Sequence, residues 1–443
     1  MNFLMLWFSL KSFLSSGSTI PMQQSIKKDR FIPLRKTDLI KACLDDGRLP
    51  SEQLKAFKAL CQLIVSTLHF EYHQVLEELK DSYAPFDPNS DTLPVTMLTN
   101  DILQTKQGTF SQRFIQVLNA ANFEKVTDQD LQEALQEESL FKVRLAVEFD
   151  DFADVVFYRR GEYQQTETII KFWGLRKQNI TFTNYDKVAV YIKFKDADYY
   201  DGAKTVTKNF EPGSTIIKLF QNVPKADLEM LFPNSQVRMR TIDKAIIGGS
   251  ALVGGAVVLV TKLGASLFVL AGLFGYWLGL SSKEVTINTQ QLLALGVGVG
   301  VLGGFIFKEW SKFKNRKLRF MKALADNLYF KNLDNNSGVF HNLIDSAEEE
   351  ECKEAILAYY FLVVQGNSMT SEQLDNKIEQ WFEEKFDFQI DFEITDALAK
   401  LERFGIVKSN VGKYTALPIS AAQVKLDANW DGIFSFSKAP LPE

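Results

Sequence analysis

Cysteine and histidine are scarce in this chain of 443 residues, which has three of each. Cys43, Cys61 and Cys352 are odd in number and far apart, which argues against a disulfide framework and indicates a reducing compartment. The sequence also has no CxxC pair, no GxSxG elbow and no HExxH helix. We therefore predict no catalytic residue and no cofactor from its motifs.

A strong charge imbalance is missing as well. The net charge is −5, with 24% charged and 46% hydrophobic residues, both ordinary for folded protein. The whole chain therefore has no general attraction to nucleic acid or to anionic lipid. Its length predicts two to three domains.

Long apolar runs are confined to residues 245–307. The stretch Gly248–Leu280 is rich in glycine, and its interior charge is Lys262. A phosphate-binding loop has the spacing GxxxxGK[ST], but here Gly254 is followed by Gly255 and Ala256. This departure excludes a phosphate-binding loop.

The apolar runs 245–261, 263–280 and 292–307 predict membrane helices, since a span needs about 17–25 residues without charge. Basic residues crowd positions 308–322, and this flank should therefore face the cytoplasm. The basic flank before residue 245 should do the same, which requires an even number of crossings. We predict a transmembrane hairpin over 241–310; three full spans and a buried soluble hairpin are the alternatives.

Glycine recurs in the apolar region at helical spacing. Gly296, Gly300 and Gly304 line one helix face, and Gly275 and Gly279 repeat the interval. Small residues at this spacing let helix backbones approach closely in lipid. The pattern predicts a glycine zipper between the two faces, and it offers a surface for a homo-oligomer.

The remaining sequence predicts soluble parts. Ser51–Tyr83 reads as one amphipathic helix, and alternation from residue 143 onward predicts an antiparallel sheet of about five strands. Helices followed by a hairpin around Ser409–Lys413 have the outline of a winged helix, and Thr370 or Ser371 is a helix cap.

The fold class is an α+β membrane protein, divided into a start extension or disordered segment (1–27), a helical region (28–140), a sheet domain (141–240), the hairpin (241–310), a basic juxtamembrane helix and loop (311–345), a winged-helix-like domain (346–418) and a tail (419–443). The first residues make a poor signal peptide, and Met1 and Met22 are both candidate starts.

Two clusters carry weak chemical hypotheses. His69 and His73 lie one helical turn apart and could share a metal ion; a plain polar helix face is the alternative. Arg159 and Arg160 end a strand-like run. Neighbours on a strand point to opposite faces, so they cannot clamp one phosphate together, but one of them could contact an anion or a lipid headgroup.

Acidic runs offer little more. Asp150, Asp151 and Asp154 have the DDxxD spacing that holds magnesium against a diphosphate on a helix, but strand-like flanks favour a hairpin turn here. The run 347–352, AEEEEC, is most simply the acidic first turn of a helix.

A winged helix raises the question of DNA. Acidic residues outnumber basic ones about two to one over 347–415. The helix that would enter the groove, 391–404, carries Lys400 and Arg403 against Asp391, Glu393, Asp396 and Glu402. Because neutralised phosphates supply most nonspecific affinity, we predict a protein-binding winged helix and no nucleic-acid partner.

Several segments together resemble a known family. These are RFIPLRKTDLI (30–40), VVFYRRG (155–161), STIIKLFQNVPKADLEMLFP (214–233), the glycine-rich region, and the basic run leading into AILAYYFL (355–362). From about Asp29 to Pro418 the chain resembles the transmembrane protein 143 family of uncharacterised proteins. The resemblance implies an integral membrane protein, mitochondrial in eukaryotic relatives and in the inner membrane if bacterial, and it supplies no activity.

Two functions compete. The first is a membrane-anchored scaffold or adaptor that presents cytoplasmic-side domains to protein partners and has the lipid bilayer as a further partner. The second is an enzyme acting on a lipid or another membrane-proximal substrate. A pocket that gathers Asp or His with Arg159 or Arg160 would favour the enzyme, and an exposed apolar patch without one would favour the adaptor.

Overall fold

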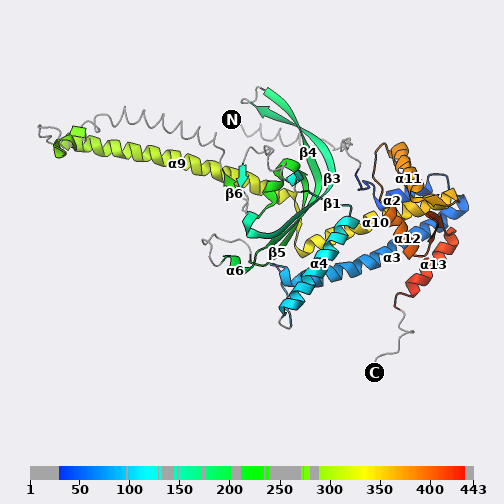
Figure 1. Cartoon of the computed structure of the whole chain (residues 1–443). Helices are drawn as coiled ribbons and strands as arrows, with labels where there is room; N and C mark the ends of the chain where they lie inside the picture. Colours follow the sequence, from blue (N-terminus) through cyan, green and yellow to red (C-terminus); the bar gives the residue numbers. More distant parts are fainter. Residues whose placement is uncertain are drawn as a thin grey trace, which may run out of the picture. The chain divides into compact units, whose positions relative to one another are not determined.

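The chain forms an α/β protein with antiparallel sheets, seen here in a computed structural model (Figure 1). The structure describes residues 29–95, 98–127, 129–131, 144–146, 149–171, 176–200, 211–233, 236–238, 271–272, 274–279 and 289–434. These fall into two units, a larger one of 1–130, 150–225 and 332–443 and a smaller one of 131–149 and 226–331.

The sheet of the larger unit is antiparallel, as predicted. Its five strands have the order β1-β3-β4-β5-β7, with β1 at Glu124–Lys125, β3 at Phe152–Lys171, β4 at Arg176–Phe194, β5 at Thr215–Pro224 and β7 at Asn332–Asn335. Strands β3 and β4 are both long and continuous, and Gly161 lies at a position of β3 that the register with β4 passes over. Gly161 has φ +70°, and a Cβ there would lie 2.7 Å from Cβ of Asp186.

The middle of β4 is buried on both faces. Val188 and Val190 alternate with Ala189 and Tyr191, and all four are at most 7% exposed. Ala189 and Tyr191 belong to a core with residues of three helices, Phe110 among them. The alternation in the sequence therefore identifies the strand but not the second buried face.

Helices pack on this sheet and extend beyond it. The helices of the core beside the sheet are α3 (Ser51–Tyr83), α4 (Asn100–Ala120) and α10 (Ser337–Gln365), whereas α2 (Lys36–Leu44) packs on α3 and α10 in the other core. The chain also has the short helical turns η1 (Ala84–Phe86), η2 (Phe149–Asp151), α6 (Ala197–Tyr200) and η3 (Lys225–Leu231). The prediction for α3 is confirmed. Helix α10 contributes to both hydrophobic cores of the unit: its first turns pack beside the sheet and its last turns pack against α2, α3 and α12. In Figure 1, α10 runs from the sheet to these helices.

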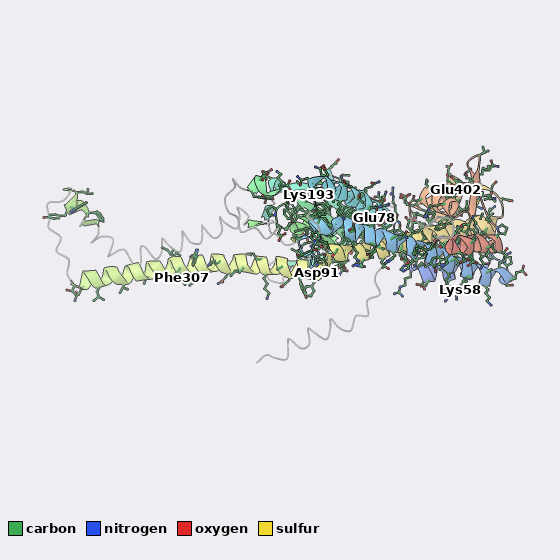
Figure 2. The ribbon with its side chains drawn as sticks, turned by 90° about the horizontal axis from the view of Figure 1, so that it is seen from below. Lys58, Glu78, Asp91, Lys193, Phe307 and Glu402 are labelled. Carbon is green, nitrogen blue, oxygen red and sulfur yellow. The ribbon has the colours of Figure 1, made fainter. Side chains whose placement is uncertain are left out.

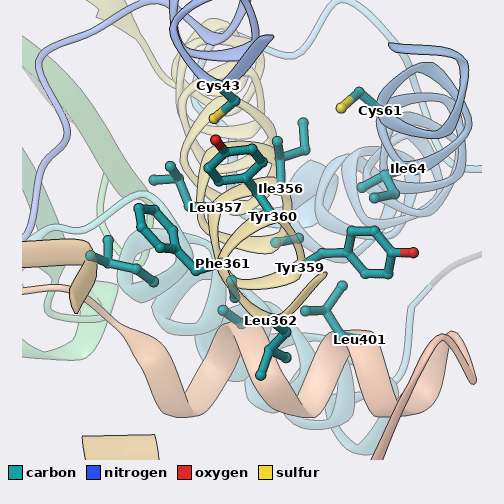
Figure 3. Close-up of a cluster of buried hydrophobic side chains, with 14 of the residues drawn as sticks. Cys43, Cys61, Ile64, Ile356, Leu357, Tyr359, Tyr360, Phe361, Leu362 and Leu401 are labelled. Atoms are coloured by element: carbon teal, nitrogen blue, oxygen red, sulfur yellow. The ribbon is translucent and has the colours of Figure 1, made fainter. Parts of the chain in front are cut away.

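The second core has the element order of a winged helix. After α10 come β8 (Met369–Thr370), α11 (Ser371–Phe386), α12 (Ile394–Arg403), β9 (Val407–Asn410) and β10 (Lys413–Ala416), with the strand order β8-β10-β9, and then α13 (Ile419–Asp431). Thr370 caps α11 in a capping box with Gln373. Figure 3 shows Tyr359 and Tyr360 of α10 projecting to different sides within this core, Tyr360 toward Cys43.

The smaller unit contains the strand pair β2 (Arg144–Ala146) and β6 (Gln236–Arg238) and the helix α9 (Thr289–Lys331). Large apolar side chains are exposed along α9, among them Phe307 at 65% and Trp310 at 53% (Phe307 in Figure 2). The predicted basic segment after residue 308 is a direct continuation of this helix.

The predicted transmembrane hairpin over 241–310 is wrong, and so is the integral membrane localisation that depended on it. Within the described ranges, no helix has both the length and the apolar content needed to cross a membrane. The apolar run 292–307 is shorter than the usual span of about 20 residues, and α9 carries it directly into basic sequence. The run 245–270 lies outside the described residues.

The predicted glycine zipper is wrong as well. A Cβ added at Gly275, Gly296, Gly300 or Gly304 would meet no heavy atom of another segment within 4 Å, so nothing in the described chain packs closely on these positions. Gly279 has φ +72° and follows a helical turn rather than continuing its face.

Candidate functional site

The most unusual side chains of the larger unit lie in the middle of α10. The acidic run 348–351 is not the first turn of a helix, because α10 begins at Ser337. Four charged residues here are only 1–2% exposed: Glu350, Glu351, Lys353 and Glu354. A buried charge is costly unless it is paired and hydrogen-bonded, so their partners determine what this cluster can do.

The segment 30–36 supplies many of those partners. The Ile32 amide donates to Oε2 of Glu350 at 3.0 Å, and Nζ of Lys353 donates to the carbonyls of Ile32 (2.7 Å) and Leu34 (3.2 Å). Lys353 also donates to Oε1 of Glu350 at 2.6 Å. The Lys36 amide donates to Glu349 at 2.6 Å. Charged groups of α10 thus hold an extended segment more than 300 residues away in sequence.

Arg160 reaches the same cluster from β3. Its side chain is 5% exposed and lies over the rings of Phe31 (4.3 Å) and Phe123 (5.0 Å). Burial lowers its pKa, and the charge of Glu350 opposes that shift. Arg159 instead pairs with Glu124 (2.9 Å) and Glu162 (2.7 Å). Arg159 is thus paired with two carboxylates, whereas Arg160 donates to the Ala121 carbonyl (3.3 Å) and feels the charges of Glu350, Asp186 and Asp29.

Glu354 is a further buried acid of the cluster, at 2% exposure. Burial raises its pKa well above the ordinary value, and the hydrogen bond from Nδ2 of Asn122 (3.0 Å) opposes the shift. Asn122 also donates to the Arg30 carbonyl, so one amide joins the segment 30–36, the end of α4 and α10. The polar side chains at this end of the cluster, Asn122 and Glu354, therefore bind each other.

A cavity of about 220 Å³ lies beside the cluster, between α3, α4, α10 and α12. Glu351 and Lys400 line it from one side, and Tyr72 and Val117 line it from others. Nζ of Lys400 contacts the Glu351 carboxylate and lies 3.5 Å from Glu354 and 3.4 Å from Asp396. Burial lowers the pKa of Lys400 to about 7.

Lys400 and Arg403, the basic residues of α12, are both engaged inside the unit. Lys400 is paired with α10, and its side chain is 12% exposed. Arg403 is bidentate with Glu71 of α3, with Nη2 2.8 Å from Oε2. The side chains that α12 exposes are Thr395, Asp396, Ala399, Glu402 and part of Arg403 (Glu402 in Figure 2).

The wing, the hairpin of β9 and β10, ends in a tight two-residue loop. Asn410 pairs with Lys413, so Val411 and Gly412 form the turn. Val411 has φ +50° and is 96% exposed. A β-branched residue in this conformation is a strained outlier, and asparagine is the usual occupant of such turns. Lys408 and Lys413 are exposed on either side of the turn.

Of the remaining predicted residues, His69 contacts the acidic run 348–351, and the three aspartates at 150–154 belong to other elements. Nδ1 of His69 bonds Glu348 at 2.7 Å, and His69 and His73 border an open hollow with Phe70 and Trp430. In the part of the chain that is described, no group of three or more His, Cys, Asp or Glu side chains could hold a metal ion. Residues Asp150, Asp151 and Asp154 lie in η2 and at the start of β3 rather than on a long helix.

Sequence reasoning missed Glu351 and Lys400. A signal was present: no proline or mid-helix glycine interrupts residues 339–365, so the acidic run must lie inside a helix with apolar residues on both sides. A helix of that kind is buried all round, and its charges need internal partners.

By fold, this is an α/β protein in which a five-stranded antiparallel sheet and a winged-helix-like part share the helix α10. A family model described as a protein of unknown function, DUF3754, matches residues 185–338, about a third of the chain. The match places the chain beside an uncharacterised family and brings no activity with it. No solved structure matches the chain.

Proposed function

We propose that the protein is a scaffold or adaptor whose winged-helix-like part binds a protein partner through the wing. The observation that carries this proposal is the apolar side chain of Val411, 96% exposed at a strained turn between Lys408 and Lys413. A non-glycine residue held in the left-handed region is strained, and such positions cluster at ligand clamps and switch regions. The flanking lysines favour a partner with an acidic surface around an apolar depression.

The pairing of α12 supports a protein rather than DNA as the partner. In DNA-binding winged helices, the helix equivalent to α12 enters the major groove. Contacts with the DNA phosphates then need lysine or arginine side chains that are not already paired within the protein. Here Lys400 and Arg403 are engaged by Glu351 and Glu71, and the exposed acids Asp396 and Glu402 would repel phosphate. Kinship with the transmembrane protein 143 family, based on the motifs at 155–161 and 214–233, remains a proposal without an activity.

Photo-crosslinking from the wing tests this function. A photoreactive residue at Val411 of the full chain should yield crosslinks to a distinct protein, whereas the same residue at Val424 should not. Val424 is the matched control, an exposed valine (70%) on α13. Adding excess Val411→Asn protein should leave the crosslink intact, and adding excess unaltered protein should abolish it, because asparagine fits the turn but removes the apolar tip.

Two results would refute the proposal. One is the same set of crosslinked proteins from positions 411 and 424. The other is a duplex-DNA shift by the full chain at micromolar concentration near physiological salt, abolished by Lys408→Ala and Lys413→Ala.

A further inference from the structure

The open hollow between α3, α10 and α13 gathers two of the three histidines of the chain. His69 and His73 lie one turn apart on α3, and this spacing places them on the same face of the helix. Both line the hollow, whose volume is about 650 Å³, and Glu348 of α10 lines it with them. The two imidazole rings and one carboxylate therefore border a single space.

Glu348 determines how the ring of His69 is held. Nδ1 of His69 lies 2.7 Å from Oε2 of Glu348, and Nζ of Lys36 lies 3.5 Å from the other carboxylate oxygen. The side chain of Glu348 is only 14% exposed, so this acceptor has a fixed position. A carboxylate accepts hydrogen bonds, so Nδ1 of His69 carries a proton and donates it. In the neutral ring, the lone pair of Nε2 is then available to a ligand.

The pair has the arrangement of metal-binding histidines. A histidine that binds a metal through one ring nitrogen almost always donates its other N–H to a carboxylate, a backbone carbonyl or water. His69 already makes this contact, yet its side chain is 72% exposed and accessible to an ion. His73 is also exposed. Two histidines four positions apart on one helix face can share one ion.

We propose that His69 and His73 together bind one divalent transition-metal ion of the Zn²⁺ and Cu²⁺ class. Imidazole nitrogen suits these ions, whereas Mg²⁺ and Ca²⁺ prefer oxygen ligands. Within the described ranges no group of three His, Cys, Asp or Glu side chains forms a metal site, so water completes the coordination of the ion. Glu348 does not touch the ion and acts as a positioning residue for His69.

Zinc titration of the full chain tests the proposal, with a chromophoric chelator as the competitor. His69→Gln and His73→Gln should each weaken Zn²⁺ binding by about tenfold or more, because the second bond to an ion held by the first is intramolecular. His341→Gln is the matched control: His341 is exposed on α10 and does not line the hollow, so the affinity should be unchanged. Cu²⁺ should bind more tightly than Zn²⁺, and Mg²⁺ should not compete.

A second pair of variants tests the role of Glu348. Glu348→Ala should weaken Zn²⁺ binding by about 10–100-fold, the usual loss when a carboxylate behind a metal-binding histidine is removed. Glu349→Ala removes the same charge from α10, but Glu349 bonds the Lys36 amide rather than His69, so the affinity should change little. Circular dichroism without metal checks that both variants are folded.

Three results would overturn the proposal. The first is Zn²⁺ binding by the unaltered protein that is no tighter than binding by the double variant His69→Gln and His73→Gln. The second is a loss of affinity in His341→Gln as large as in His69→Gln. The third is an equal loss in Glu348→Ala and Glu349→Ala, which would reduce Glu348 to a general negative charge. None of these results bears on the wing, which contains no histidine.

Discussion

The long helices α9 and α10 show opposite relations between composition and burial. Helix α9 exposes Phe307, Trp310 and Tyr329, the last at 78%, whereas α10 buries Glu350 and Lys353 at 1%. Charged residues are buried here because the segment 30–36 brings hydrogen-bonding partners to them and Arg160 of β3 brings a positive charge close to Glu350. An apolar residue is exposed because no described element packs on it. Burial is thus determined by the partners that the fold supplies, and residue polarity alone predicts it poorly.

The largest difference between the helices should appear at their lysines. Lys353→Met leaves Glu350 buried without its cation, and we expect a loss of about 3–5 kcal/mol in the stability of the larger unit. Lys312→Met on α9 removes an exposed ion pair with Glu309 and should change stability by less than about 0.5 kcal/mol. Hydrogen exchange of peptides from each helix measures both. Equal losses of stability in the two variants would contradict the difference in burial between the lysines of α9 and α10.

The next largest difference in stability should appear at a tyrosine of each helix, Tyr360 of α10 and Tyr329 of α9. The Tyr360 hydroxyl donates to Asp46 at 2.8 Å and helps to lower the pKa of that acid. Tyr360→Phe should cost about 1.5–3 kcal/mol, the usual value for a hydrogen bond to a charged group. The loss should shrink in acid, because an acid with a lowered pKa stabilises the fold above its unfolded pKa and less as pH falls. Tyr329→Phe on α9 should have no measurable effect on urea unfolding.

Glu354 extends the comparison of the two helices to the dependence of stability on pH. Because its pKa is raised in the folded state, this acid holds its proton more tightly when folded. That contribution is present below about pH 4.5 and is lost as pH rises toward the raised value, at up to about 1.4 kcal/mol per pH unit. Glu354→Gln should remove this slope and match or exceed the unaltered protein at pH 7. Glu309→Gln on α9 should leave the slope unchanged; a persistent slope in Glu354→Gln would assign it elsewhere.

The smallest effects should come from one substitution made in each helix. A Cβ at Gly300 of α9 meets nothing within 4 Å, so Gly300→Ala should stabilise the helix by about 0.5–1 kcal/mol. A Cβ at Gly338 of α10 would lie 2.6 Å from Oδ1 of Asp334, so Gly338→Ala should be destabilising or lose that gain. Hydrogen exchange of residues 292–307 and 337–350 compares them. Destabilisation by Gly300→Ala would restore a packing role for that glycine.

Local patterns were enough to predict several elements. The ends of α3, the cap at Thr370 and the antiparallel sheet all follow from breakers, capping residues and alternation within a few positions. Interactions between distant residues could not be found this way. The burial of Glu350 depends on Ile32 and Lys353, and the site of Lys400 depends on Glu351 and Arg403. The apolar run 292–307 predicts a membrane helix by composition, but its environment depends on the rest of α9.

The attachment of the segment 30–36 to α10 has a consequence for synthesis. The amide of Ile32 meets Glu350, 318 positions later in the chain, and the Asp29 carbonyl accepts from the Asp391 amide. At ordinary rates of translation, roughly 15–60 s separate the emergence of the first partner from that of Glu350. During this interval Phe31 and Ile32 remain without their final partners, and closure of a loop this long slows folding. The first described residues of the chain are thus among the last to reach their native contacts, and chaperones have their longest opportunity there.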